Sequence, residues 1–168
     1  MTTKRKDRDD AFHRFFLSEG ERLRRLGLLM TGDPERAVDL AQEALARTYR
    51  HWGRIRHEDP GPYARRILVN LVRSAHRRRL LELRHNRPAL EVVDSRSPQV
   101  DEYLRVTEAL KVLPPIRRAT VVLRFYEDMS EAEIARVLDR PLGTVKSDIH
   151  RSLKKLKDLL DESERESA

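Results

Sequence analysis

The chain has 168 residues and a mass of 19.7 kDa, which allows one ordinary domain or two small ones and excludes a large multidomain enzyme. Charged residues make up 38% of it, and it has no cysteine for disulfides, thiolate zinc sites or cysteine nucleophiles. No apolar run approaches the roughly 18 residues that span a bilayer, and the mixed charges of the first ten residues argue against a signal peptide. We therefore expect a soluble, cytoplasmic protein that is not inserted into a membrane.

The positive charge is concentrated in the first half of the chain. Residues 1–87 hold 19 Arg and 2 Lys against 12 acids, a net charge of +9. Residues 88–168 hold 9 Arg and 5 Lys against 16 acids, a net charge of −2. This asymmetry suggests a polyanionic partner for the first half and a more selective partner for the second.

The first half has the hydrophobic pattern of three long helices. Apolar residues at three-to-four spacing predict a helix over residues 12–30, and Thr31-Gly32 ends it. A second helix is predicted over 34–52, with Asp33 as its N-cap. A loop is predicted over 53–61, and a third helix then runs from 62 to about 84.

The helical period is lost after residue 84, in a stretch that contains two prolines and two serines. Further helical patterns follow over 100–113, 114–126 and 130–160, the last divided near Asp139. The predicted fold class is therefore all-α. It consists of two small helical domains, residues 1–84 and 101–168, joined by a flexible linker at 85–100.

The last part of the chain has the pattern of a helix-turn-helix. Ser130 and Glu133 form a capping-box pattern, Asp139-Arg140 predicts a tight turn, and Pro141 begins a second helix. In that helix the residues predicted to face inward are Leu142, Val145, Ile149, Leu153 and Leu156. Those predicted on its outer face are Thr144, Lys146, Ser147, Asp148, His150, Arg151 and Lys154. Such a face suits the DNA major groove, and an ordinary helical hairpin with a solvated basic face is the alternative.

The third predicted helix carries a basic face opposite its apolar one. Its members are Arg66, Asn70, Arg73, Ser74, Arg77 and Arg78. These side chains suit backbone phosphates and exposed bases. Trp52 and Tyr63 lie near the preceding loop, where an aromatic ring can stack on an unpaired base, although core packing is the commoner role of such residues.

Several segments resemble bacterial sigma factors. Residues 29–43 resemble their region 2.1–2.2, and residues 63–79 resemble region 2.4. Three further segments resemble region 4, namely residues 113–118, 123–130 and 143–147. Region 2 followed by region 4, with a short linker between them, is the layout of the extracytoplasmic-function (ECF) subfamily of the sigma-70 family.

The resemblance implies a subunit that binds core RNA polymerase, directs it to the −35 and −10 promoter elements and initiates transcription. Its partners would be the β′ clamp helices and β flap of the polymerase, promoter DNA and, as a regulator, an anti-sigma factor. The residues that match the clamp-docking motif are Asp39, Leu40, Gln42 and Glu43. The residues that match positions contacting the −10 element are Asn70, Ser74, Arg77, Arg78 and Arg79. Arg66 and Arg73 lie on the same predicted face. Contacts to the −35 element fall to Thr144, Lys146, Ser147, His150, Arg151 and Lys154.

Four positions depart from the family pattern. Ser74 stands where Asp is common, Asp139 replaces the glycine of the turn, and Pro141 replaces the usual Ser cap. Asp148 stands on the recognition helix where a basic residue is usual. An acid there would repel a nearby phosphate and could accept a hydrogen bond from the amino group of a cytosine.

Two other functions fit parts of the pattern. A stand-alone helix-turn-helix transcriptional regulator would bind duplex DNA without polymerase, and a helical adaptor would bind acidic protein surfaces and no DNA. An enzyme is not expected, because the six histidines show no metal-ligand pairing and no nucleophilic triad or glycine-rich phosphate loop occurs. We expect no catalytic residue, no metal site and no cofactor.

Overall fold

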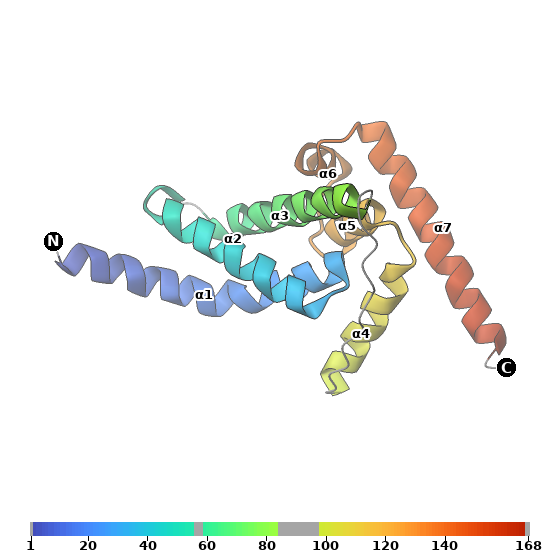
Figure 1. Ribbon diagram of the computed structural model, residues 1–168, viewed down its shortest axis with the longest axis horizontal. Coiled ribbons are helices and arrows are strands. Elements are labelled where there is room, and N and C mark those ends of the chain that lie inside the picture. The colour runs from blue at the N-terminus through green and yellow to red at the C-terminus, as the bar shows by residue number, and fades with distance from the viewer. Residues whose placement is uncertain (1, 56–58, 84–97, 167–168) are drawn as a thin grey trace. The chain divides into compact units, whose positions relative to one another are not determined.

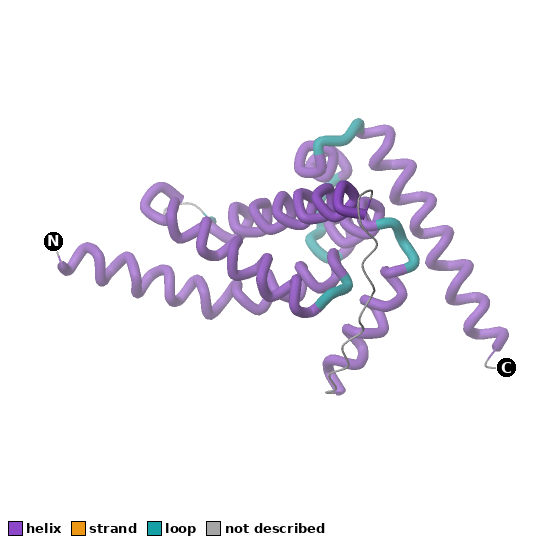
Figure 2. Tube along the Cα trace, in the orientation of Figure 1, coloured by secondary structure: helices purple, strands orange, loops and turns teal. Residues whose placement is uncertain are grey.

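The computed structural model describes residues 2–55, 59–83 and 98–166 (Figure 1). Across these ranges the chain forms seven helices and no strand (Figure 2), which confirms the all-α prediction. The chain divides in space into two compact units, Met1–Val72 and Arg73–Ala168. None of the helices in the described ranges combines the length and apolar character needed to cross a membrane.

The first unit contains helices α1 (Thr2–Thr31) and α2 (Pro34–Ile55) and the first part of α3 (Pro60–Leu83). Helices α1 and α2 pack against each other along a shared face (Figure 1). Between them Gly32 has a φ of 70°, a left-handed conformation that glycine adopts without strain. The N–H of Arg36 donates to Asp33 Oδ1 at 3.1 Å, so Asp33 caps α2 as predicted.

The core of this unit is made of small and aliphatic side chains. Its buried members include Leu23, Leu26, Met30, Ala37, Ala41, Ala44, Ala64 and Leu68. Helices α1 and α2 are in close contact at Gly27. A Cβ atom placed there would lie 3.2 Å from the carbonyl oxygen and 3.3 Å from the Cα of Ala37. Both are backbone atoms, so the distance between the helices depends on the missing side chain.

Helix α1 begins ten residues before the predicted start at residue 12. The apolar repeat does not extend that far, but polar contacts fix this part of α1 to α2. Arg8 Nη2 donates to the hydroxyl of Tyr49 at 2.8 Å, and that hydroxyl donates to Asp9 Oδ1 at 2.6 Å. The Arg8 guanidinium also lies over the Tyr49 ring, 4.7 Å from its centroid.

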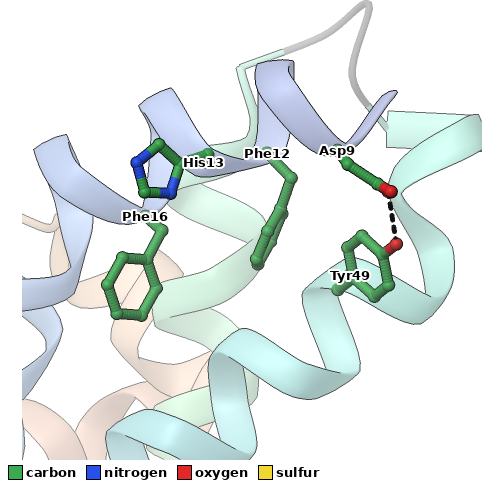
Figure 3. A pocket seen from close by; sticks show the side chains of 5 residues that line it. All are labelled: Asp9, Phe12, His13, Phe16 and Tyr49. Carbon is green, nitrogen blue, oxygen red and sulfur yellow. Dashed lines mark hydrogen bonds between the residues drawn. The ribbon is translucent and has the colours of Figure 1, made fainter. Parts of the chain in front are cut away.

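An aromatic cluster continues this contact toward the core. The Phe12 ring packs edge-on against the rings of Tyr49 and Trp52, with centroids 4.8 and 5.2 Å away. Beside it, a shallow pocket is lined by Asp9, Phe12, His13, Phe16 and Tyr49 (Figure 3). Trp52 is 3% exposed, which confirms a core role for its ring.

The predicted loop at 53–61 is wrong at both ends, because α2 continues to Ile55 and α3 begins at Pro60. Residues 56–58 lie outside the described ranges. Asp59 Oδ1 accepts a hydrogen bond from the N–H of Gly61 at 3.0 Å and so satisfies a free donor at the start of α3. Most of the predicted linker also lies outside the described residues, which resume at Pro98.

The second unit contains α4 (Pro98–Lys111), α5 (Pro115–Phe125), α6 (Glu131–Leu138) and α7 (Leu142–Glu166). Its core forms where α5, α6 and α7 meet. The buried residues there include Ala119, Val122, Leu123, Ile134, Leu138, Val145 and Ile149. The predicted helices 100–113, 114–126 and 130–160 match these elements to within a few residues, apart from the extension of α7 to Glu166.

A buried arginine closes the end of α4. Arg118 Nε donates to the carbonyl of Leu110 at 3.0 Å, and Arg118 Nη2 lies 3.3 and 3.4 Å from the carbonyls of Lys111 and Leu113. The last carbonyls of a helix have no partner within the helix. Arg118 therefore supplies the donors that α4 lacks, and burial lowers the pKa of its guanidinium.

Candidate nucleic-acid interfaces

The helix-turn-helix of the second unit has the local geometry that its sequence predicts. The N–H of Glu133 donates to Ser130 Oγ at 3.3 Å, and the N–H of Ser130 donates to Glu133 Oε2 at 2.8 Å, so the capping box is confirmed. The hydrogen bond from the Ser130 side chain lowers the pKa of Glu133. Asp139 ends α6 at φ 53° and ψ 56°, the left-handed conformation that the turn requires.

Helix α7 presents a polar face to solvent. Of the six predicted −35 contacts, Lys146, Ser147, His150, Arg151 and Lys154 are exposed and Thr144 is half-buried. Val145 and Ile149 are buried on the opposite side, as predicted. The first four turns of α7 therefore offer hydroxyl, imidazole and cationic groups on one accessible surface.

The predicted orientation of three other residues of α7 is wrong. Leu142 and Leu153 were expected inside and are each 43% exposed, whereas Asp148 was expected on the outer face and is 5% exposed. The buried stripe follows Val145, Ile149 and Ser152 and extends toward Asp148. Helical geometry then places Leu142 and Leu153 at the solvent margin.

Asp148 is tolerated inside because two arginines neutralise it. Arg117 Nε donates to Asp148 Oδ1 at 3.2 Å, and Arg140 Nη2 lies 3.6 Å from Asp148 Oδ2. Because Asp148 is only 5% exposed, its carboxylate cannot accept a hydrogen bond from the amino group of a cytosine in this structure. Sequence reasoning missed both arginines. The signal was an acid spaced three residues after the apolar Val145, which requires cations from neighbouring elements.

Helix α3 carries the predicted basic face. Its exposed members are Arg66, Asn70, Ser74, Arg77 and Arg78, and its half-buried members are Arg73 and Arg79. Ala64 and Leu68 are buried on another side of the same helix. The face is thus displayed by one continuous helix, which suits contacts with successive groups along a nucleic-acid strand. Nearby, Tyr63 is half-buried, with its ring centroid 6.2 Å from that of His51.

Helix α2 carries the predicted acidic face. Asp39 and Gln42 are exposed, and Leu40 and Glu43 are half-buried. Arg47 Nε donates to Glu43 Oε1 at 2.7 Å, and this hydrogen bond lowers the pKa of Glu43. The spacing of residues 39, 42 and 43 places them on one side of the helix. In the described ranges, no group of three or more His, Asp or Glu lies close enough together to hold a metal ion.

Two solved structures have a fold similar to that of this chain. The chain aligns with the sigma factor RpoE from Bartonella quintana, crystallised with the anti-sigma factor NepR. The TM-score is 0.66, the identity 21%, and the alignment covers 89% of this chain and 96% of that one. CnrH, solved in complex with the cytosolic domain of CnrY, gives a TM-score of 0.61 at 23% identity, with 91% and 89% of the two chains covered. At these identities the likeness shows a shared fold.

Sequence comparison supplies the family. Residues 15–80 match Sigma-70 region 2, and residues 103–156 match Sigma-70, region 4. The chain is 41% identical over 132 residues to the RNA polymerase sigma-E factor of Streptomyces antibioticus, covering 77% of this chain and 73% of the relative. It is 36% identical over 152 residues to the sigma-E factor of Streptomyces coelicolor, covering 89% and 85%. The chain belongs to the ECF subfamily of sigma-70 RNA polymerase sigma factors. A stand-alone regulator is not favoured, because the matches include region 2 as well as region 4.

Proposed function

We propose that three helices of this sigma factor have separate binding functions. Helix α2 binds core RNA polymerase, α3 engages the −10 element, and α7 reads the −35 element. The observation that carries the proposal is the pair of exposed polar faces on α3 and α7, each in the part of the chain that matches the corresponding sigma region. Promoter DNA is the polyanion that suits the excess of arginine in the first half.

Polymerase binding is assigned to Asp39, Leu40, Gln42 and Glu43 on α2. Asp39 is exposed and has no ion-pair partner among the described residues, so its charge is available to a basic surface such as the β′ clamp helices. Glu43 is already paired with Arg47, and its contribution requires that this exposed pair be shared or broken. Exposed pairs cost little to break, so the pairing does not prevent docking.

The −10 contacts are assigned to Arg66, Asn70, Arg73, Ser74, Arg77, Arg78 and Arg79, and the −35 contacts to Thr144, Lys146, Ser147, His150, Arg151 and Lys154. The proposed domains are residues 1–84 and 101–168, with the linker at 85–100. Support for keeping α3 in the first domain comes from the match to region 2, which continues to residue 80. The second domain is assigned to the −35 element and the polymerase β flap.

The protein acts in transcription without chemistry of its own, in the cytoplasm, where polymerase and promoter DNA are found. One solved neighbour, the sigma factor RpoE, was crystallised with an anti-sigma factor, and we assign an inhibitor of the same class to this chain. Such an inhibitor would hold the factor inactive until a signal releases it.

The proposal is tested by run-off transcription with purified core RNA polymerase and a library of genomic promoters. Protein-dependent transcripts from a defined set of promoters are the expected result. Asp39→Arg should abolish these transcripts together with binding to core polymerase. Asp10→Arg makes the same charge change at an exposed position of α1 and should preserve both. A chain that retards duplex DNA alone and never supports transcription would refute the proposal in favour of a regulator.

A further inference from the structure

A buried carboxylate in α7 joins three elements of the helix-turn-helix. Asp148 is reached by Arg117 from the first turn of α5 and by Arg140 from the turn between α6 and α7. The distances are 3.2 Å from Arg117 Nε to Oδ1 and 3.6 Å from Arg140 Nη2 to Oδ2. A buried carboxylate is costly unless it is paired. Asp148 is therefore held together with its two cationic partners. We call Arg117 and Arg140 the arginine pair of Asp148.

The two arginines are much more accessible than the carboxylate that holds them. Their side chains are 32% and 31% exposed, against 8% for that of Asp148. Arg117 uses only Nε in its hydrogen bond, and among the described residues no further acceptor lies on either guanidinium. Each guanidinium has five N–H donors. Most of these donors, and one unit of positive charge, remain available to a ligand.

The arginine pair lies at the edge of the surface assigned to the −35 element. Thr144 lies one helical turn before Asp148, and Arg151 one turn after it, so both are its neighbours on α7. In a docked helix-turn-helix, the first residues of the recognition helix contact base edges in the major groove, and the helix before the turn crosses the DNA backbone, so side chains beside the turn lie next to phosphates. Anionic phosphates are then the groups nearest to Arg140 and Arg117.

We propose that Arg117 and Arg140 bind two phosphates of the DNA backbone beside the recognition helix, and that Asp148 is the positioning residue that orients both. This inference rests on the proposed function. A planar guanidinium binds phosphate in a bidentate manner, and one that is already oriented loses less freedom on binding. Contacts of this kind fix the register of the helix in the groove without reading a base.

The test removes charges one at a time from both protein and DNA. Holoenzyme is assembled from core polymerase and the full chain, and its affinity is measured for a promoter identified by run-off transcription. In a parallel series, single phosphates that flank the −35 element are replaced by neutral methylphosphonates. The protein variants are Arg117→Gln and Arg140→Gln. Arg105→Gln makes the same change at an exposed residue of α4 and serves as the control.

Each arginine variant is expected to lose roughly tenfold in affinity for the unmodified promoter. Each should also become insensitive to one particular methylphosphonate that weakens the native complex, and the two insensitive positions should differ. The control should keep native affinity and sensitivity. If both variants bind less tightly but respond to every methylphosphonate as the native protein does, the arginines only support the fold and the inference is refuted.

Asp148→Asn separates positioning from simple repulsion of DNA. The asparagine keeps the shape and one acceptor oxygen but removes the charge that draws in both arginines. The expected result is reduced sensitivity at both phosphates at once. Tighter binding with unchanged sensitivity would show that Asp148 only repels DNA, and would overturn its positioning role. Absence of transcription with the native chain on any promoter would instead refute the proposed function, and the inference with it.

Discussion

Replacing Arg118 tests how far one buried cation stabilises the second unit. Arg118→Met keeps an unbranched apolar side chain but removes the guanidinium that donates to the carbonyls of residues 110, 111 and 113. Only the 3.0 Å bond has the normal length of an N–H···O hydrogen bond, while those at 3.3 and 3.4 Å are weak. A buried hydrogen bond to a charged group contributes about 1.5–3 kcal/mol, and removing the buried cation recovers part of that. We expect the free energy of unfolding to fall by about 1–2 kcal/mol.

The assay uses the single tryptophan of the chain as an internal reference. Trp52 lies in the core of the first unit, so its fluorescence follows that unit during urea unfolding, whereas far-ultraviolet circular dichroism follows both. The transition of the second unit should move to lower urea by about 1.5 M, and the fluorescence transition should keep its midpoint. Arg105→Met, at an exposed site on α4, should change stability by less than about 0.5 kcal/mol. Equal effects of the two substitutions would refute the capping role of Arg118.

Three further predictions concern the two nucleic-acid faces and the cap between α5 and α6. Arg78→Ala should slow promoter opening with little loss of polymerase binding, whereas Arg14→Ala, an exposed control on α1, should do neither; equal loss of both activities would contradict the division of roles. Arg151→Ala should cost of order 1–3 kcal/mol in binding, mainly at the −35 element, and an unchanged −35 preference would remove it from the reading face. Ser130→Ala should lower stability by about 1 kcal/mol at neutral pH. Because the pKa of Glu133 is lowered in the folded state, this difference should shrink as the pH falls below about 4.5 in acid titrations followed by circular dichroism, and a difference independent of pH would be the contrary result.

Most of the fold could be predicted from residues that lie close together in the sequence. The caps at Asp33 and Ser130 and the left-handed turn at Asp139 depend on residues within a few positions of one another, so sequence reasoning could place them. The start of α1 depends instead on Tyr49, some forty residues away from Arg8 and Asp9. Periodicity within one helix contains no information about such a partner.

The orientation of α7 shows the same limit at the candidate site. The three-to-four spacing of apolar residues placed Leu142 and Leu153 inside and left Asp148 on the outer face, and all three lie on the other side in the structure. Asp148 is inside only because Arg117 and Arg140 approach from other elements, and their approach is a property of the tertiary fold. The exposed residues of the reading face, by contrast, followed directly from the helical period.

The contact between Gly27 and Ala37 is the point about which α2 would tilt against α1. Ala37 lies in the first turn of α2, two residues before Asp39, and the rest of the helix extends about 27 Å beyond it at 1.5 Å per residue. A rigid helix converts a small shift at one end into a larger one at the other. A single added methyl at Gly27 would therefore change the angle of α2 and displace both the acidic face and the aromatic cluster around Trp52, although neither touches the glycine. A glycine packed against one end of α2 thus controls where the other end of that helix lies.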